Sequence, residues 1–371
     1  MPLTLPPSCQ VGDPLSAIDT PALVIDLDAF ERNVALLQAR CDAAGVPLRP
    51  HAKAHKTPAI SLAQIRAGAV GICCQKVSEA LPFAQAGVQD IYISNEVNGP
   101  KKAALLAELA RHARVGACVD HATQVADIGA AAARKGSQIA LCVEVNIGQD
   151  RCGVDSAEAL LALVDLIAAQ PQLRFKGLQA YHGKMQHVRS HDERRALAAR
   201  AAERTAGFVA ALRARGISCE VVSGGGSGSA EFDLQSGVFN ELQAGSYVFM
   251  DGDYGRNDYA GSLRFEHSLF IASSVMSIGS GERIVLDAGL KSIAVDSGLP
   301  DVWQRELDYV AANDEHGIVQ ARGADRPGLG DTLLLVPGHC DPTLNLHDEL
   351  IGLRAGRVEC IWPIAARGLS R

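Results

Sequence analysis

Several features that would assign this chain of 371 residues to a particular class are missing from it. No apolar run approaches the roughly 20 residues of a membrane-spanning helix, and the first residues lack the basic segment and apolar core of a signal peptide. The net charge is −7 without a long basic run, which argues against a nucleic-acid partner. Ten cysteines are scattered without a CxxC pair, as expected of a reduced, cytoplasmic protein.

The sequence instead alternates short apolar runs with Ala/Leu-rich helical periods between about residues 22 and 250. The runs occupy residues 22–27, 48–53, 71–76, 91–95, 115–120, 139–146, 175–181 and 220–223. Eight strands alternating with helices predict a (β/α)8 TIM barrel. A doubly wound parallel sheet is the alternative.

Polar residues favour the barrel, because they stand at the end of nearly every predicted strand, where barrel enzymes place their chemistry. These residues are Lys53, Gln75, Asn95, Asp120, Asn146, Tyr181 and Ser223. After about residue 255 the runs become short, β-rich and separated by Gly, Pro, Asp and Asn. We therefore expect a barrel domain over 1–255 and a second, all-β domain over 256–371.

The stretch Leu-Arg-Pro-His-Ala-Lys-Ala-His-Lys begins at residue 48 and ends a predicted strand. Side chains alternate along a strand, so Arg49, His51 and Lys53 are expected to share one face. A buried lysine among cationic groups has a lowered pKa and is a nucleophile for Schiff-base chemistry. A solvent-facing basic strand end is an equally good interpretation of this stretch alone.

Three further motifs follow predicted strands. The segment Ser-Gly-Gly-Gly-Ser-Gly-Ser (223–229) follows the eighth predicted strand. It favours phosphate binding, because glycines leave backbone N–H groups accessible to an anion. A flexible turn is the alternative. Arg151 follows the sixth and is suited to hold a phenolate or carboxylate, unless it is an ordinary loop arginine. His182 and His187 follow the seventh and are acid–base candidates or plain loop histidines.

The β-rich region contains Pro-Gly-His-Cys-Asp-Pro-Thr, residues 337–343. In an extended chain His339 and Asp341 point the same way and can share a metal ion, with Cys340 turned aside. A nitrogen–oxygen pair favours Mn²⁺, Mg²⁺ or Co²⁺ over structural zinc. An isolated H-x-D is also a common accident.

Together these motifs, along nearly the whole chain, resemble the fold-type III (alanine-racemase-like) pyridoxal-phosphate enzymes. The resemblance is to the D-threonine aldolase branch, near the D-serine dehydratase-like and 3-hydroxy-D-aspartate aldolase enzymes. The related dehydratases generally carry H-x-C at the metal pair and use zinc. Asp341 in place of that cysteine favours the aldolase branch and a harder metal, although a shift of register would offer Cys340 as a ligand.

The resemblance implies roles for particular residues. Lys53 would carry pyridoxal 5'-phosphate, and His187 would lie near the substrate hydroxyl as the other catalytic residue. His339 and Asp341 would bind the divalent metal, Mn²⁺ first, with Mg²⁺ or Co²⁺ as options. The residues implied to contact the cofactor besides Lys53 are Gln75, Arg151, Tyr181, Gly225, Gly226, Ser227, Ser246 and Tyr247.

The implied activity is retro-aldol cleavage of a D-β-hydroxy amino acid to glycine and an aldehyde, in a homodimer. A 3-hydroxy-D-aspartate aldolase, and a D-serine or D-3-hydroxyaspartate dehydratase that releases ammonia and a keto acid, are the alternatives. A non-catalytic pyridoxal-phosphate carrier is disfavoured, because those small relatives lack a β domain. We expect a small-molecule substrate and neither nucleic acid nor membrane as a partner.

Overall fold

The computed structural model describes residues 6–261, 263–279 and 283–371, and the chain forms two compact units. One unit, called here the β unit, comprises the chain up to Val34 with Ser246–Arg256 and Phe265–Arg367. The other, the barrel unit, comprises Ala35–Gly245, Asn257–Arg264 and Gly368–Arg371. The residues up to Val34 thus belong with the β-rich part of the chain.

The barrel unit contains a parallel sheet of seven strands that follow one another in chain order. The strands are β2 (Ile72–Cys74), β3 (Asp90–Glu96), β4 (Arg114–Val119), β5 (Ile139–Glu144), β6 (Leu173–Ala180), β7 (Val221–Gly224) and β8 (Glu241–Leu242). Residues 47–51 bond to both edges: Leu48 forms a parallel bridge with Leu242, and His51 forms one with Cys73. This segment therefore comes first in the barrel and brings its strand-like members to the predicted eight.

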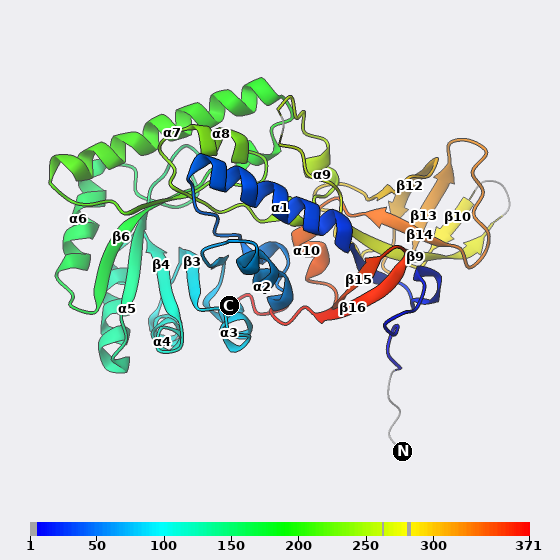
Figure 1. Ribbon diagram of the computed structural model, residues 1–371, viewed down its shortest axis with the longest axis horizontal. Helices are drawn as coiled ribbons and strands as arrows, with labels where there is room; N and C mark the ends of the chain where they lie inside the picture. Colours follow the sequence, from blue (N-terminus) through cyan, green and yellow to red (C-terminus); the bar gives the residue numbers. More distant parts are fainter. Residues whose placement is uncertain (1–5, 262, 280–282) are drawn as a thin grey trace, which may run out of the picture. The chain divides into compact units, whose positions relative to one another are not determined.

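Helices succeed one another along the outer face of these strands (Figure 1). They are α2 (Pro58–Arg66), α3 (Val77–Gln85), α4 (Pro100–Leu109), α5 (Ala122–Lys135), α6 (Ala157–Ala168), α7 (His191–Ala214) and α8 (Ala230–Gln235), with η2 (Ala52–Ala54) and η3 (Lys184–His187) as short 3-10 turns. Local chemistry fixes their ends: the Ser156 hydroxyl accepts from the Ala159 N–H, and Gly136 ends α5 with a φ of 63°.

The interior of the barrel explains the cysteines. Cys73, Tyr92, Cys118 and Cys142 form one buried cluster contributed by the neighbouring strands β2 to β5. All ten cysteines of the chain are free thiols. The prediction of a reduced set of small core residues is confirmed for this cluster. Within the described residues, no helix is both long enough and apolar enough to cross a membrane.

The β unit is built on a sheet of nine strands. Its main path runs β12 (Leu307–Ala312), β13 (Gly317–Ala321), β10 (Arg283–Leu286), β9 (Leu269–Ile278), β1 (Ala22–Asp26), β15 (Glu349–Arg354) and β16 (Arg357–Pro363), with β14 (Thr332–Val336) paired to β9 and β11 (Asp301–Val302) paired to β14. The short helical pieces are η1 (Leu15–Ala17), η4 (Ser246–Val248), α9 (Gly252–Gly255) and α10 (Cys340–Leu344). The predicted β-rich region is thus confirmed.

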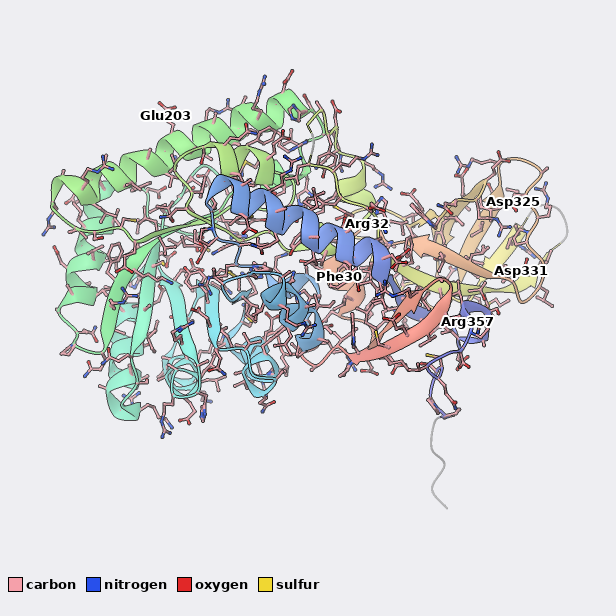
Figure 2. The ribbon with its side chains drawn as sticks, viewed as in Figure 1. Phe30, Arg32, Glu203, Asp325, Asp331 and Arg357 are labelled. Carbon is pink, nitrogen blue, oxygen red and sulfur yellow. The ribbon has the colours of Figure 1, made fainter. Side chains whose placement is uncertain are left out.

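One predicted barrel strand was assigned to the wrong sheet. Residues 22–26 form β1, which pairs with β9 and β15 in the β unit. The strand that the sequence did not reveal is β8, because Glu241–Leu242 is only two residues long. Helix α1 (Leu27–Ala44) follows β1, and its first turns belong to the β unit, where Phe30 packs on Trp362 and Arg32 pairs with Glu266 at 2.8 Å (Figure 2).

Candidate functional site

Lys53 lies where the first barrel segment ends. The chain leaves the bridge at His51 and turns at once into η2, whose N-cap is His51; the His51 Nδ1 accepts from the Lys53 N–H at 3.4 Å. The His51 Nε2 lies 3.0 Å from the Gln75 Oε1 and 2.9 Å from the Ser94 Oγ. Two of the predicted residues, Lys53 and Gln75, are therefore brought together at the carboxyl ends of neighbouring strands by a histidine from the same motif.

Arg49 does not share the surroundings of Lys53, contrary to the expectation of a common strand face. Its guanidinium is buried and lies 2.7 Å from Asp90 and 2.9 Å from Glu241. Both carboxylates are the first residues of their strands, so this ion pair lies toward the amino ends of the barrel strands. Lys56 is also paired, with Glu79 at 3.0 Å. The basic motif is thus split between a structural ion pair and the predicted site.

Arg151 and Tyr181 meet at the carboxyl ends of β5 and β6. The Arg151 guanidinium lies over the Tyr181 ring, 5.4 Å from its centroid, which is a cation–π contact. Hydrogen bonds on both sides of Arg151 hold its loop in place. The Asn146 Oδ1 accepts from the Gly148 N–H at 3.0 Å, and the Asp120 carboxylate accepts from the Gly153 N–H at 3.1 Å. The prediction that these two residues share a site agrees with this contact.

The glycine-rich segment follows β7, the seventh position of the barrel, and not the eighth as predicted. Gly225 has a φ of +75° and Ser227 is buried, and the Ser227 Oγ has no hydrogen-bond partner within the described structure. A Cβ on Gly226 would approach the Gln186 Oε1 to 2.5 Å, so the backbone needs glycine there. A buried hydroxyl without a partner beside glycine amides fits a phosphate group, which supplies the missing acceptor.

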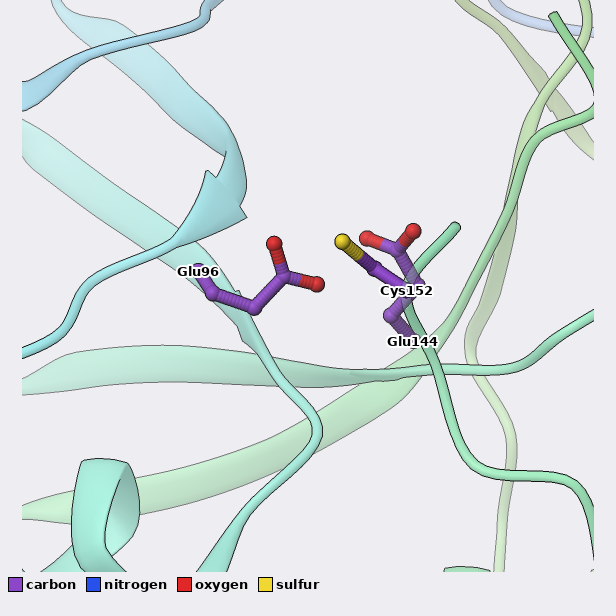
Figure 3. A group of neighbouring side chains, drawn as sticks. All are labelled: Glu96, Glu144 and Cys152. Atoms are coloured by element: carbon purple, nitrogen blue, oxygen red, sulfur yellow. The ribbon is translucent and has the colours of Figure 1, made fainter. Parts of the chain in front are cut away.

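A group of acidic residues that the sequence analysis missed lies on the same rim (Figure 3). Glu96 ends β3, Glu144 ends β5 and Cys152 follows Arg151; their ligand-capable atoms all lie within 4.8 Å of one another. Burial, and then the Glu96 carboxylate, raise the pKa of Glu144 to about 8. The rule of polar residues at strand ends points to Glu96 and Glu144, but the predicted strand limits selected Asn95 and Asn146 instead.

The two histidines after β6 differ in their surroundings. His182 is buried, and burial lowers its pKa below the usual range of histidine. His187 is the last residue of η3 and is exposed. Between them, the buried Gln186 had no predicted role, although it contacts the glycine-rich loop.

The remaining predicted residues belong to the β unit. Ser246 and Tyr247 are buried in η4, and the Tyr247 ring packs against Phe265 with centroids 5.6 Å apart. Their proposed contact with phosphate stays a prediction.

The chain around the predicted metal pair is not extended, so the reason given for its convergence is wrong. His339 has an extended backbone but is the N-cap of α10, and Asp341 lies in that helix's first turn. The His339 Nδ1 lies 2.7 Å from an Asp296 oxygen, and Cys340 is buried with its N–H bonded to Asp251 at 2.9 Å. With a carboxylate on Nδ1, Nε2 is the nitrogen that could serve as a metal ligand, as in the carboxylate–histidine pairs of metal sites.

Comparisons with known proteins agree with this architecture. The alanine racemase N-terminal domain family matches residues 25–253, and the putative serine dehydratase domain family matches residues 268–353. A D-threonine aldolase of Arthrobacter sp is 53% identical over 100% of this chain and 98% of its own length. A 3-hydroxy-D-aspartate aldolase of Paracoccus denitrificans (strain Pd 1222) is 46% identical over 95% of this chain and 93% of its own.

Solved structures give the same result. The crystal structure of D-threonine aldolase from Filomicrobium marinum has a TM-score of 0.96 at 48% identity, covering 98% of this chain and 100% of that one. D-threo-3-hydroxyaspartate dehydratase from Delftia sp. HT23 has a TM-score of 0.85 at 29% identity, covering 95% and 98%. The chain therefore belongs to the alanine-racemase-like, fold-type III family of pyridoxal-phosphate enzymes, in the lyase branch of D-threonine aldolase and 3-hydroxy-D-aspartate aldolase.

Proposed function

We propose that this enzyme is a D-threonine aldolase that uses pyridoxal phosphate and a divalent cation to cleave D-β-hydroxy amino acids to glycine and an aldehyde. The observation that carries the proposal is the 53% identity to a D-threonine aldolase along the full chain. The sequence His339-Cys340-Asp341 agrees with it, since it offers a carboxylate at the second ligand position. The lyase class follows from the family, whereas the substrate and the metal are part of the proposal.

The cofactor residues proposed in the barrel unit fit the phosphate and ring of pyridoxal phosphate. Lys53 would carry the cofactor covalently, Gln75 and Tyr181 would line its ring, and Arg151 would hold its 3-oxygen. Gly225, Gly226 and Ser227 would hold the phosphate, with Ser246 and Tyr247 as further phosphate contacts. When bound, the cofactor supplies an electron sink for the pair released by the breaking Cα–Cβ bond.

The metal residues proposed in the β unit are His339 and Asp341. An imidazole and a carboxylate leave most of the coordination sphere to water and substrate, which suits Mn²⁺, Mg²⁺ or Co²⁺. Such an ion would draw negative charge from the substrate's β-oxygen. His187 would accept the β-hydroxyl proton at a ring nitrogen, a role for which its exposed position leaves room.

The second candidate is a dehydratase or an aldolase for 3-hydroxy-D-aspartate. Two solved variants of a D-threo-3-hydroxyaspartate dehydratase replace a histidine and a cysteine two positions later, and the cysteine variant is described as metal-free. This chain has an aspartate two positions after His339, which supports the aldolase over the dehydratase. The 46% identity to a 3-hydroxy-D-aspartate aldolase keeps that substrate as the alternative.

The test is a product analysis with purified protein. D-threonine, D-threo-3-hydroxyaspartate and D-phenylserine are each incubated with Mn²⁺ and with a chelator, and glycine, aldehyde, ammonia and keto acid are measured. We expect glycine and aldehyde in the presence of Mn²⁺ and no turnover with chelator. Keto acid and ammonia would identify a dehydratase, and full activity in chelator, or equal cleavage of L-threonine, would refute the proposal.

Variants separate the metal from the fold. Asp341→Ala should behave like the chelated enzyme while it keeps the absorbance of the bound cofactor, because the substitution removes a metal ligand and leaves Lys53 in place. Asp348→Ala, at an exposed carboxylate of the same unit that pairs with Arg367, is the matched control and should be fully active.

We also propose that the enzyme is cytoplasmic and that it forms a homodimer. The dimer is proposed because fold-type III enzymes usually pair the barrel of one subunit with the β domain of the other. Sedimentation of the purified chain at decreasing concentration, with activity measured in parallel, tests the dimer. A monomer that stays active would contradict it.

A further inference from the structure

A buried carboxylate lies directly beneath the glycine-rich loop. Asp233, on α8, is 2% exposed, and its Oδ2 accepts from the Ser229 hydroxyl at 2.5 Å. The Ser229 Oγ in turn accepts from the Gly226 N–H at 3.3 Å and from the Gln186 Nε2 at 2.8 Å. A hydroxyl donates once and accepts twice, so Ser229 uses its full capacity.

The side chain of Gln186, which lies in η3, forms hydrogen bonds with the same loop. Its side-chain oxygen accepts from the Gly228 N–H at 2.9 Å, and its side-chain nitrogen donates to Ser229 as described. Gln186 is fully buried, and its own carbonyl accepts from the Asn257 side chain at 2.8 Å. Both ends of the Gln186 amide therefore bond to the loop, one at Gly228 and one at Ser229.

The loop backbone is packed down on these groups. A Cβ on Gly225 would come within 2.5 Å of the Asp233 Oδ2, and one on Gly228 within 2.4 Å of the Gln186 carbonyl. The Arg194 guanidinium on α7, also buried, donates to the Gly228 carbonyl at 2.8 Å. The loop thus has little freedom, while the Ser227 hydroxyl in its middle has no partner within the described structure.

From this geometry we infer that Asp233, acting through Ser229 and Gln186, is the positioning residue that holds the loop in the shape required by the cofactor's phosphate. The carboxylate fixes the Ser229 hydroxyl, and the hydroxyl fixes the Gly226 amide and the Gln186 side chain. Ser227 and the glycine amides are then presented to the anion without further ordering. The inference rests on the proposed phosphate role of Gly225–Ser227 and deepens it.

The placement also carries a dependence on pH. Burial raises the pKa of Asp233. Hydrogen bonds from the Ser229 hydroxyl and the Gly226 amide lower it but offset only part of the rise, so the resulting pKa is about 7. On α8 and on α7, which packs against it, the charged or titratable groups that are not exposed, besides Asp233, are Arg194, His191 and Glu231. The Glu231 carboxylate lies 3.7 Å from the His191 ring. Below pH 7 the carboxyl is neutral. Above it, the buried negative charge lies beneath an anion and opposes its binding.

The experiment compares two probes on the full chain stripped of cofactor: pyridoxal phosphate and pyridoxal, which lacks the phosphate. Binding is followed by absorbance, so aldolase activity plays no part. Asp233→Ala should raise the Kd for pyridoxal phosphate at least tenfold and change that for pyridoxal less than twofold. Asn240→Ala, which removes hydrogen bonds to the Val222 N–H and the Glu220 carbonyl at the amino end of β7, is the control and should change neither.

Asp233→Asn keeps an oxygen for Ser229 and removes the charge. The second ionisation of the phosphate, with a pKa of about 6, gives both proteins a common pH dependence. Beyond it, the ratio of the two affinities should shift further against pyridoxal phosphate between pH 6 and pH 8 in the wild type than in Asp233→Asn. Equal losses for both probes in Asp233→Ala, or identical pH profiles for wild type and Asp233→Asn, would overturn the inference. Failure of the wild type to bind pyridoxal phosphate would instead overturn the proposed function.

Discussion

Replacement of Ser227 by alanine should change stability and cofactor affinity in opposite directions. The Ser227 Oγ is buried without a partner, and such a group costs roughly 1–3 kcal/mol of folding free energy. Ser227→Ala removes that cost, so the cofactor-free protein should become more stable. The same change removes one hydrogen bond to a charged phosphate, which contributes about 1.5–3 kcal/mol.

The expected loss of affinity follows from these magnitudes. At about 1.4 kcal/mol for each tenfold change, the Kd for pyridoxal phosphate should rise between roughly 10-fold and 150-fold. The assays are an absorbance titration with the cofactor and thermal unfolding of the cofactor-free chain. Pyridoxal, without the phosphate, should bind both proteins equally.

Ser223 provides a matched control four residues away. Its hydroxyl is also buried but is satisfied, since it donates to Glu241 at 2.7 Å and accepts from the Gln243 side chain at 2.7 Å. Ser223→Ala should therefore destabilise the protein by roughly 1–3 kcal/mol without a phosphate-specific loss of affinity. The reasoning is refuted if Ser227→Ala lowers the stability of the cofactor-free protein, or leaves the Kd for pyridoxal phosphate unchanged.

Three further predictions concern the barrel unit. Borohydride reduction of the cofactor-loaded protein should place the mass label on Lys53, and a label on Lys56 would contradict the assignment. Arg49→Met should destabilise the fold by about 3–5 kcal/mol in denaturant unfolding, because the buried Glu241 loses its cation; an unchanged midpoint would count against this pair. The pKa of Glu144 is raised from 4.5 to about 8, so between these pH values the folded state binds a proton that the unfolded state does not. Wild-type stability should therefore fall as pH rises from about 4.5 to 8, by at most about 1.4 kcal/mol per pH unit, and Glu144→Gln should flatten that slope. Equal slopes in the two proteins would show the assignment to be wrong.

The sequence alone determined the class of fold and the region of the site. Alternation of short apolar runs with helical periods is a local pattern, so it identified the barrel without tertiary information. Lys53, Gln75, Arg151 and Tyr181 were predicted because they end or follow parallel strands, whose carboxyl ends meet on one rim. The resemblance to fold-type III enzymes, on which the individual cofactor roles depend, was also available from the motifs.

Tertiary structure decided which residues share surroundings. Residues 22–26 have the apolar pattern of any buried strand, and only pairing with β9 and β15 assigns them to the β unit. Arg49 and Lys53 are four residues apart, yet the 3-10 turn at Ala52–Ala54 breaks the alternation that placed them on one face. The start of α10 after His339 changed the geometry of the predicted metal pair in the same way.

The convergence of the acidic group at the rim and the support of the glycine-rich loop were decided by tertiary structure. Glu96, Glu144 and Cys152 come from three places in the chain, and Gln186 and Asp233 approach the loop from two others. Gln186 bonds to Gly228 across 42 residues of sequence, whereas Asp233 bonds to Ser229 across only 4, and it is packing that buries both side chains. Sequence determines the elements through near-neighbour interactions, whereas burial and pairing between distant residues exist only once the chain has folded.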